Sequence, residues 1–586
     1  MVSPKNCFPE KHHVADLCVV GGGIPGVCAA LAAARHGLKV IIMQDRPVLG
    51  GNSSSECRVH ICGADRAGGI PHRRETGILE ELRLENIRRN RQKSFSIWDT
   101  VLYEAAMQEP NLDVLYNCSC HDAEMDGARI LAVAGWQLTT QTRHVVKADI
   151  FADCSGDAVL APLTGARFRI GREARSEFNE SFAPERADRK TMGMTCWFQA
   201  YECDTPQPFS PPEWAYTFEH CDQLPGGHQW PVMGYWWVEM GGEHDSIHQT
   251  EEMRDELLKI IYGVWDHLKN HCEHRDQFKN WVIDWINFLP AKRESRRYVG
   301  DHVLAQPDIE GGGAFDDVVA YGGWTMDDHH PAGFWCVKAG APPTEFHHAP
   351  SPFGIPYRSL YSKNIDNLMF AGRCHSATHF GLSSTRVMAT GAVMGQAVGT
   401  AASIARREAV GPRDVNEFMD ELQQTLLRDD CYLPGIARRY SDLTRTSELS
   451  ASQGDPEPLR DGITRQVEDD PHSWEHAAGD WAMLAFAEPQ HVKEVQLVLD
   501  SALDRDIQMH LTRKDPEGWW DFPDVMPRVF TVEARQEGEW KKVAEFTDNH
   551  QRLIRVPVND AFDAVRYTLH ETWGAGKTRL YAFSVS

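Results

Sequence analysis

Residues 15–43 read ADLCVVGGGIPGVCAALAAARHGLKVIIM, and this stretch decides the fold of the N-terminal part of the chain. The apolar run that ends at Val20 predicts a buried strand, and it meets three consecutive glycines that begin at Gly21. An alanine-rich segment then predicts a helix as far as His36, and KVIIM at 39–43 predicts a second strand. Strand, turn, helix and strand fit within about thirty residues, the length of one βαβ unit. We therefore expect an α/β fold that begins with two parallel strands.

The glycine turn has the spacing of a dinucleotide site. Gly21 permits the tight turn, Gly23 lets a diphosphate approach the backbone, and Gly26 lets the helix pack closely on the strand. The N-terminus of the helix that follows favours an anion. Gln44 occupies the position nearest to the usual ribose-binding acid, and Asp45 follows one step later, so both are candidates for the ribose. We predict that a dinucleotide binds at this turn.

Composition and charge exclude several classes of partner. The chain has 586 residues, of which 42% are hydrophobic and 25% charged, so it can bury a substantial core. The net charge of −24 argues against nucleic acid or an anionic membrane as the main partner. No apolar run reaches the ~18 residues of a membrane span. All 15 cysteines lie between Cys7 and Cys431 at irregular spacing, which favours reduced thiols. We expect a cytoplasmic protein.

The middle of the chain changes its pattern several times. Helical periodicity predicts helices at 76–89, 98–108 and 251–270, and short β runs at 111–153 predict a β-meander. Residues 165–350 are irregular and rich in Trp, Pro, Gly and His, which favours a region that covers a substrate. In the third predicted helix, five apolar residues share one face, and we expect that face to pack in the core: Met253, Leu257, Ile261, Trp265 and Leu268.

The C-terminal part reads as repeated short strands without helices, which predicts a β-sandwich. The runs are WAMLAF (481–486), VKEVQLVL (492–499), DIQMHLT (506–512), RVFTVEAR (528–535), LIRVPV (553–558), AVRYTLHE (564–571) and LYAFSVS (580–586). Its opening resembles discoidin-type, galactose-binding-like modules, many of which bind sugars through aromatic loop residues. We expect Trp474 and Trp481 in the core, and Trp519 and Trp520 exposed in a turn-rich loop.

Seven motifs together resemble the FAD-dependent oxidoreductase family, kin to fumarate reductase, aspartate oxidase and the glutathione-reductase superfamily. They are GGGIPG (21–26), LGGNSSSE (49–56), RETGILEELRLEN (74–86), ADIFADCSGDAVLAPLTGA (148–166), PAKRESRRYVGDHVL (290–304), YGGWTMDDHHP (321–331) and AGR (371–373). The resemblance covers residues 14–410. It implies FAD and a redox reaction. No second GxGxxG has the right flanks, so the electrons are expected to pass to oxygen, a quinone or another protein rather than through a dedicated NAD(P)H domain.

The resemblance also implies a domain order and further cofactor contacts. We expect a Rossmann-like FAD-binding part with a β-meander at 14–165, an inserted α+β substrate domain at 166–350, a second FAD-binding part at 351–440, and the sandwich at 441–586. Beside the glycine turn, Gln44 and Asp45, the residues expected near the flavin are Gly50, Gly51, Asn52, Arg58, Asp153, Gly156, Asp157, Gly372, Arg373 and Ser383.

Four residues are candidates for catalysis. His379 and Arg386 begin the segment that faces the flavin in relatives, where His379 is suited to handle a proton; the alternative is a histidine bonded to a backbone carbonyl. Arg293 is suited to clamp a carboxylate or a polyol, although a salt-bridged strand would leave the same pattern. His329 is a further acid or base. Four adjacent residues, DDHH at 327–330, cannot all converge on an ion, so no metal site is expected.

These observations support three hypotheses of function. The first is oxidation of a small polar organic substrate, with a sugar or sugar acid as a candidate, by hydride transfer to flavin N5. The second is a flavin-dependent isomerisation or elimination without net redox, which needs no terminal acceptor. The third is a glycan-binding protein whose flavin domain is degenerate, an idea that rests on Gln44 in place of the usual acid.

Overall fold

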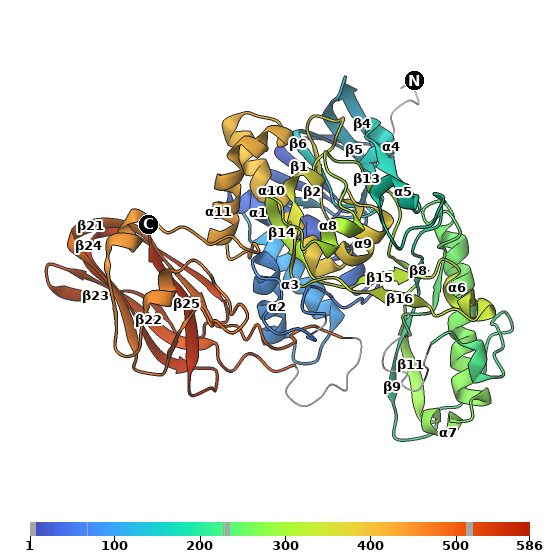
Figure 1. The fold of residues 1–586 in the computed structure, drawn as a ribbon. Coiled ribbons are helices and arrows are strands. Elements are labelled where there is room, and N and C mark those ends of the chain that lie inside the picture. Colours follow the sequence, from blue (N-terminus) through green and yellow to red (C-terminus); the bar gives the residue numbers. More distant parts are fainter. Residues whose placement is uncertain (1–7, 67, 227, 229–234, 511–519) are drawn as a thin grey trace. The chain divides into compact units, whose positions relative to one another are not determined.

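The computed structural model describes residues 8–66, 68–226, 228, 235–510 and 520–586 (Figure 1). The chain divides into two compact units. The first comprises the described residues within 1–63, 92–419 and 508–516, and the second those within 64–91, 420–507 and 517–586. The linear pattern did not indicate that 64–91 would group with the C-terminal part of the chain.

A seven-stranded mixed sheet forms the centre of the first unit (Figure 1). Its order is β3-β2-β1-β6-β5-β4, and β18 also pairs with β6. β1, β2, β3, β6 and β18 pair in parallel, whereas β4 and β5 form an antiparallel meander with β6. The predicted α/β fold with its meander is therefore confirmed. The strands are β1 (Glu10–Val20), β2 (Val40–Met43), β3 (Leu112–Leu115), β4 (Cys118–Asp126), β5 (Arg129–Gln137), β6 (Thr142–Asp153) and β18 (Leu368–Phe370).

Two helices of the first unit pack closely because small residues line their contact. A Cβ at Gly395 of α10 (Met388–Glu408) would lie 2.1 Å from the carbonyl oxygen of Pro25 in α1 (Ile24–Arg35). A Cβ at Gly399 would lie 2.1 Å from the carbonyl oxygen of Ala29, one turn further along α1. Larger residues at these positions would force the two helices apart.

A bend of 95° separates α9 (His379–Thr385) from α10. Among the described residues, no single helix is both long and apolar enough to cross a membrane, and these two reach that length and composition only as a bent pair. Two further helices of the first unit are α3 (Phe95–Met107) and α4 (Leu160–Thr164).

A lobe of short strands and one long helix lies between β6 and β18 in the sequence. The apolar face predicted for its long helix, α6 (Thr250–Asp266), is confirmed, because all five residues of that face are buried in one apolar cluster. A π turn, His267–His271, follows α6 directly. The remaining elements are β7 (Phe168–Arg169), α5 (Arg175–Phe178), β8 (Met194–Thr195), β9 (Phe198–Glu202), β10 (Glu239–Met240), α7 (Arg275–Phe278), β11 (Trp281–Ile286), β12 (Ala291–Lys292), β13 (Arg297–Tyr298), α8 (Gln306–Glu310), β14 (Val318–Gly322), β15 (Met326–His329), β16 (Thr344–His347) and β17 (Phe353–Pro356).

The second unit contains an all-antiparallel sandwich, as predicted, with the order β20-β25-β21-β24-β22-β23 and β19 paired to β21. Two pairs of predicted runs are each one long strand: β21 (Trp481–Leu499) and β24 (Leu553–Thr572). β-bulges bend these strands where the sequence suggested breaks. The run at 506–512 is not a strand in its described residues, and 511–512 lie outside them. The other elements are α2 (Ile78–Arg89), α11 (Met419–Arg428), α12 (Asp442–Thr446), β19 (Glu448–Ala451), β20 (Trp474–His476), β22 (Pro527–Gln536), β23 (Glu539–Phe546) and β25 (Thr578–Val585).

Buried arginine contacts explain why 64–91 belongs to the second unit. The Arg74 side chain is fully buried and pairs with Glu80 of α2 at 2.7 Å. It also donates to the carbonyl oxygens of Ser501 and Ala502 at 3.0 and 2.9 Å. A buried guanidinium needs such partners, so this side chain ties α2 to the C-terminal part of the chain.

The tryptophans of the second unit follow the prediction only in part. Trp474 is buried, as expected, and Trp481 is half-buried. The expectation that Trp520 is exposed is wrong: its side chain is buried, and its indole nitrogen donates to the carbonyl oxygen of Asn90 at 2.7 Å. Trp519 lies outside the described residues.

Candidate active site

The glycine turn between β1 and α1 has the shape that a diphosphate requires. Gly21 adopts φ +100°, and a Cβ at this residue would lie 2.5 Å from the backbone of Ser155. A Cβ at Gly26 would lie 2.0 Å from the carbonyl oxygen of Gly21. At Gly23, by contrast, a Cβ would meet no atom nearer than 3.8 Å, and no described side chain caps the first turn of α1. The turn therefore leaves one backbone face open beside a helix N-terminus, which fits an anionic dinucleotide.

The side chain after β2 holds this turn in place. The Gln44 amide is buried, accepting from the backbone N–H of Gly22 at 2.7 Å and donating to the carbonyl oxygen of Val48 at 2.8 Å. Gln44 therefore has a structural task, and its presence is no sign of a degenerate site. The carboxylate of Asp45 is exposed, which leaves it the better placed of the two candidates for a ribose. Gly50 continues the loop, with its N–H donating to the carbonyl oxygen of Gly22 at 2.8 Å.

An ion cluster forms around Asp157, after β6. Its carboxylate lies 2.8 Å from Nζ of Lys292 and 3.0 Å from a guanidinium nitrogen of Arg373, and it accepts from the hydroxyl of Ser295 at 2.7 Å. Burial opposes ionisation of Asp157, but Arg373 and Lys292 outweigh it and lower its pKa to about 2. Gly156 stands against the same guanidinium, since a Cβ there would lie 2.8 Å from it. The cluster joins the turn after β6 to the segment before α9.

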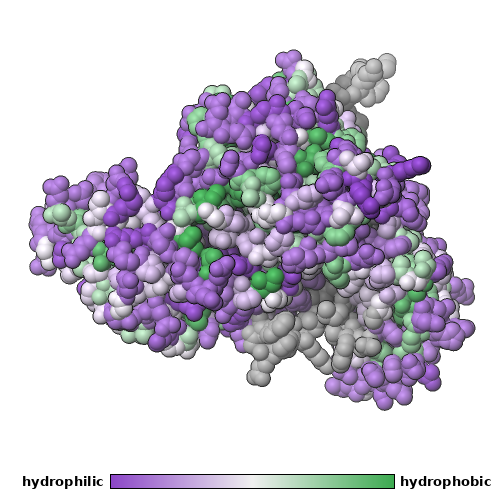
Figure 2. Space-filling view, in the orientation of Figure 1, coloured by the Kyte–Doolittle hydropathy of each residue, from purple (hydrophilic) through white to green (hydrophobic). Residues whose placement is uncertain are grey.

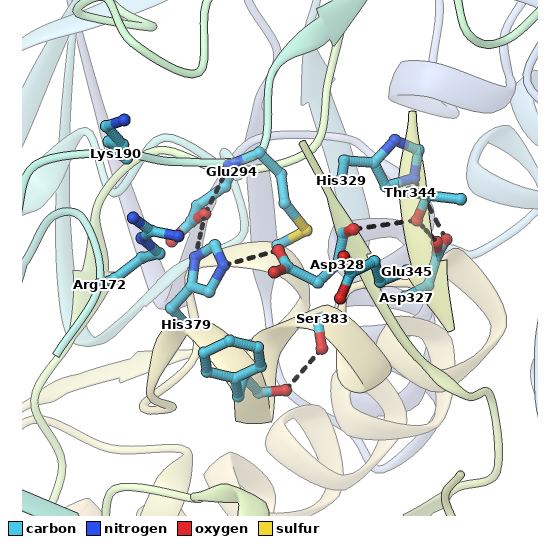
Figure 3. A network of polar contacts seen from close by, with 12 residues as sticks. Arg172, Lys190, Glu294, Asp327, Asp328, His329, Thr344, Glu345, His379 and Ser383 are labelled. Carbon is cyan, nitrogen blue, oxygen red and sulfur yellow. Dashed lines mark hydrogen bonds and ion pairs between the residues drawn. The ribbon is translucent and has the colours of Figure 1, made fainter. Parts of the chain in front are cut away.

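A second network centres on His379, the first residue of α9 (Figure 3). The imidazole lies between two carboxylates, with Nδ1 2.8 Å from Glu294 and Nε2 2.9 Å from Asp328. Burial alone would lower the pKa of His379, but the two carboxylates outweigh it and raise it to about 10. His379 is therefore an imidazolium at neutral pH and donates from both ring nitrogens. Glu294 also pairs with the buried Arg297, which in turn pairs with Glu173 at 2.8 Å.

His329, like His379, lies between two carboxylates. Its Nδ1 lies 2.6 Å from Glu239 and its Nε2 lies 3.2 Å from Asp327. Arg293 pairs with Glu239 at 3.2 Å, and Arg386 donates to Asp327 at 2.9 Å. His329 and Arg386 lower the pKa of Asp327 against the opposing effect of burial.

β15 links the two networks. Asp327 and Asp328 are adjacent in this strand, so their side chains leave it on opposite sides, and Figure 3 shows one directed toward His329 and the other toward His379. The hydroxyl of Thr344 donates to the Asp327 carboxylate at 2.6 Å and lies 3.0 Å from the carbonyl oxygen of Asp328. β15 therefore contains His329 and also supplies a carboxylate to each of the two histidines.

The family model described as FAD dependent oxidoreductase matches residues 16–426, which is most of the chain. The chain belongs to this family. Membership confirms an oxidoreductase and implies FAD, as the sequence motifs had indicated. No curated protein matches the sequence of this FAD dependent oxidoreductase.

Several solved structures are similar to parts of this FAD dependent oxidoreductase. The structure of p-nitrophenol 4-monooxygenase PnpA from Pseudomonas putida DLL-E4 has 11% identity and a TM-score of 0.34, covering 71% of this chain and 86% of that one. The family 32 carbohydrate-binding module from Streptococcus pneumoniae EndoD has 13% identity and a TM-score of 0.20, over 25% of this chain and 99% of that one. The family 32 module of C. perfringens NanJ, solved with galactose, has 12% identity and a TM-score of 0.17, over 24% and 92%. The family assignment itself rests on the family model.

Two of the predicted cofactor residues of this FAD dependent oxidoreductase, Asp153 and Ser383, make hydrogen bonds to other parts of the chain. The buried Asp153 accepts from the backbone N–H groups of Ser155 and Leu160 and from the hydroxyl of Tyr298, at 2.9, 2.8 and 2.6 Å. Ser383 is also buried and donates to the carbonyl oxygen of Phe380 at 2.7 Å. Both side chains have tasks inside the fold.

Other predicted cofactor residues lie where two parts of the first unit meet. The Asn52 amide donates to the carbonyl oxygen of Lys292 at 3.1 Å. The guanidinium of Arg58 donates to Gln199 at 2.5 Å and lies 4.2 Å from the ring centre of Trp285. Gly51 approaches the glycine turn, and Gly372 packs against the first turn of α1. These residues connect the segment after β2 with the lobe and with α1.

The four predicted catalytic residues all belong to the two networks, where His329 and His379 are buried and Arg293 and Arg386 are half-buried. Neither interpretation of His379 offered by the sequence describes it fully. Its ring bonds two carboxylates rather than a backbone carbonyl. Arg293 is ion-paired with Glu239 and also donates to the hydroxyl of Thr195 at 2.6 Å. These contacts agree with the salt-bridged alternative, and the role of Arg293 toward a substrate stays a prediction. Sequence reasoning missed the role of Glu239 and Glu173, because isolated glutamates in an irregular region give no local signal.

The pKa of His379 predicts how stability depends on pH. Because the folded-state pKa of about 10 exceeds the ordinary value of 6.5, its contribution is complete below pH 6.5 and is lost as the pH rises through about 10. We expect the melting temperature of the first unit to fall from neutral pH toward pH ~10, measured by circular dichroism. The fall should be shallower in His379→Gln. An equal alkaline fall in both proteins would contradict the assignment.

Proposed function

We propose that the chain binds FAD at the glycine turn and oxidises a polar organic substrate that carries a hydroxyl group, with a sugar or sugar acid as the first candidate. Bound FAD supplies a hydride acceptor to such a reaction. The observation that carries the proposal is the pair of the buried His379, which begins α9, and the half-buried Asp328 of β15, joined at 2.9 Å. A carboxylate held in this way provides the base that an alcohol oxidation needs.

Asp328 is the member of the His379 network that a substrate can reach. Its side chain is 18% exposed, against 1% for His379 and 0% for Glu294. His379 keeps Asp328 ionised, because the imidazolium lowers the pKa of that carboxyl against the effect of burial. We assign to Oδ2 of Asp328 the acceptance of the substrate's hydroxyl proton, while Oδ1 stays bonded to Nε2 of His379. Glu294 holds the other side of the ring and so fixes its orientation.

The proposal is tested first by the visible absorption spectrum of the purified protein, repeated on the supernatant after acid precipitation. We expect an oxidised flavin spectrum and FAD released into the supernatant, and bleaching of the spectrum by a member of a panel of sugars, polyols and sugar acids under anaerobic conditions. Colour that stays in the pellet would mean a covalent link. A colourless protein that FAD cannot reconstitute would overturn the proposal.

Gly26→Ala provides a structural prediction for the same measurement. The new Cβ would collide with the carbonyl oxygen of Gly21 and displace the first turn of α1, so we expect bound FAD to fall at least about tenfold. Gly37→Ala is the control at the other end of α1. Gly37 has φ +90° with no atom within 4 Å of a new Cβ, so the change costs about 1 kcal/mol of stability and leaves the flavin content unchanged. Equal flavin contents in the two variants would contradict the placement.

A further inference from the structure

Two cysteines and two histidines gather beside the end of α6, apart from both networks described above. Each of Cys221, His228, His267 and Cys272 offers one ligand atom, and these four atoms all lie within 4.8 Å of one another. The two sulfur atoms are 4.0 Å apart, and Sγ of Cys272 is 3.4 Å from Nε2 of His228. Two thiols and two imidazoles form a donor set that transition metals bind strongly.

The distances already match a tetrahedral site. With zinc–sulfur bonds of about 2.3 Å and zinc–nitrogen bonds of about 2.0–2.1 Å, a tetrahedron places two sulfur ligands about 3.8 Å apart and a sulfur and a nitrogen about 3.6 Å apart. The observed 4.0 and 3.4 Å differ from these values by a few tenths of an ångström. These two of the six ligand–ligand distances therefore agree with a bound ion, and the other four are no longer than 4.8 Å.

The imidazole of His267 points independently to a ligand. This residue is fully buried, and its Nδ1 donates to the carbonyl oxygen of Phe218 at 2.8 Å. The proton therefore sits on Nδ1, and Nε2 carries a lone pair. Among the described residues, Nε2 has no hydrogen-bond partner although it is shielded from solvent. A buried acceptor without a partner is costly, and a backbone carbonyl on the opposite nitrogen is the usual companion of a metal-bound histidine.

Local backbone structure aligns the other donors. The π turn brings His267 and Cys272 to one side of the helix, because the Cys272 N–H donates to the His267 carbonyl oxygen, five residues earlier, at 2.6 Å. The backbone N–H of His274 donates to the sulfur of Cys272 at 3.4 Å. Tyr235 holds His228 by donating to its carbonyl oxygen at 2.7 Å.

We propose that Cys221, His228, His267 and Cys272 bind one zinc ion. Binding forms two zinc–sulfur and two zinc–nitrogen bonds, and the two thiol protons leave to solvent. Four protein ligands leave no position for a substrate, so the site is structural. It fastens Cys221 and His228 to the end of α6. The sequence predicted no metal site, because the four adjacent residues DDHH at 327–330 cannot all converge on one ion. The spacings C-x6-H and H-x4-C are not the short ones of common zinc motifs, so they give no local signal.

The test is the metal content of the full-length protein, purified under reducing conditions without a polyhistidine tag and measured by inductively coupled plasma mass spectrometry. We expect about one zinc ion per chain in the wild type and a loss of at least about fivefold in both Cys272→Ser and His267→Gln. Cys203→Ser is the matched control, since Cys203 is a half-buried cysteine of the same lobe outside the cluster. It should keep the wild-type zinc content. A zinc content that neither ligand variant lowers would overturn the proposal.

A second measurement needs no variant, so it holds even where a ligand variant fails to fold. Wild-type protein is stripped with a chelator, kept reduced and titrated with Co²⁺ alone. We expect a thiolate-to-cobalt charge-transfer band, and d–d bands at longer wavelength than flavin absorption, which saturate at about one equivalent and disappear when Zn²⁺ is added. No thiolate band in the reduced protein would overturn the proposal. A Cys221–Cys272 disulfide, found by mass spectrometry in a protein that takes up no metal after reduction, would also overturn it.

Discussion

Asp328→Asn is expected to slow flavin reduction by the substrate about 100-fold or more, because asparagine keeps the shape of the side chain but cannot accept a proton. The loss should appear in kcat, measured by anaerobic stopped-flow bleaching of the flavin with the substrate identified by the panel. FAD content should stay at the wild-type level, since Asp328 belongs to the proton-handling network and not to the glycine turn. This prediction rests on the proposed function.

Glu345→Gln is the matched control for this experiment. Glu345 lies directly opposite Asp328 in the β15–β16 pair, but its side chain is 67% exposed, so its removal should leave the rate unchanged. His379→Gln should also slow reduction, since Asp328 then loses the cation that keeps it ionised. Wild-type rates in Asp328→Asn would show that the base lies elsewhere, even if the flavin is present.

Glu294→Ala is expected to lower the free energy of unfolding of the first unit by about 3–5 kcal/mol. The carboxylate is fully buried and serves both the His379 imidazolium and the Arg297 guanidinium, while it also accepts from the backbone N–H of Met192 at 2.9 Å. Removing it leaves buried cations without their common partner. Urea unfolding followed by tryptophan fluorescence measures the change.

Glu177→Ala serves as the comparison, because Glu177 also pairs with an arginine, Arg169, at 2.7 Å but on the surface. An exposed pair of this kind is worth about 0–1 kcal/mol. Equal losses in the two variants would show that burial does not set the energy of the network. The double variant Glu294→Ala with His379→Leu should recover part of the loss, since it removes one of the stranded charges.

Local sequence patterns were enough to predict the elements around the proposed cofactor site. The glycine turn, α1 and the parallel pair β1–β2 follow from the spacing of glycines and apolar residues over about thirty residues. The apolar face of α6 was predictable for the same reason. The length of strands β21 and β24 was not predictable. A β-bulge inside a strand and a turn between two strands both interrupt the apolar pattern with polar residues, so the sequence does not distinguish them.

The sequence indicated which histidines and arginines belong to the candidate site, but not which carboxylates they pair with. His379 stands out in the sequence, but the carboxylates that raise its pKa come from positions 85 and 51 residues earlier. The same holds for Arg293, whose partner Glu239 lies in a region without periodicity. The prediction that Trp520 is exposed was wrong because the composition of a loop does not show its distant partners. Its indole nitrogen donates to the carbonyl oxygen of Asn90, which is far away in the sequence.

The alternation of Asp327 and Asp328 limits how the chain length in this region can vary. Inserting one residue just before Asp327 would exchange the two faces of β15. Asp328 would then leave His379, and His329, itself a residue of this strand, would leave Glu239. The connection between β15 and β16 is constrained as well, because it contains a 3-10 helix, Gly333–Ala339, whose Phe334 and Cys336 side chains are buried. Length variants should therefore be rejected within the strand and in the 3-10 helix, and tolerated near Gly340, which is exposed and has no atom within 4 Å of a new Cβ.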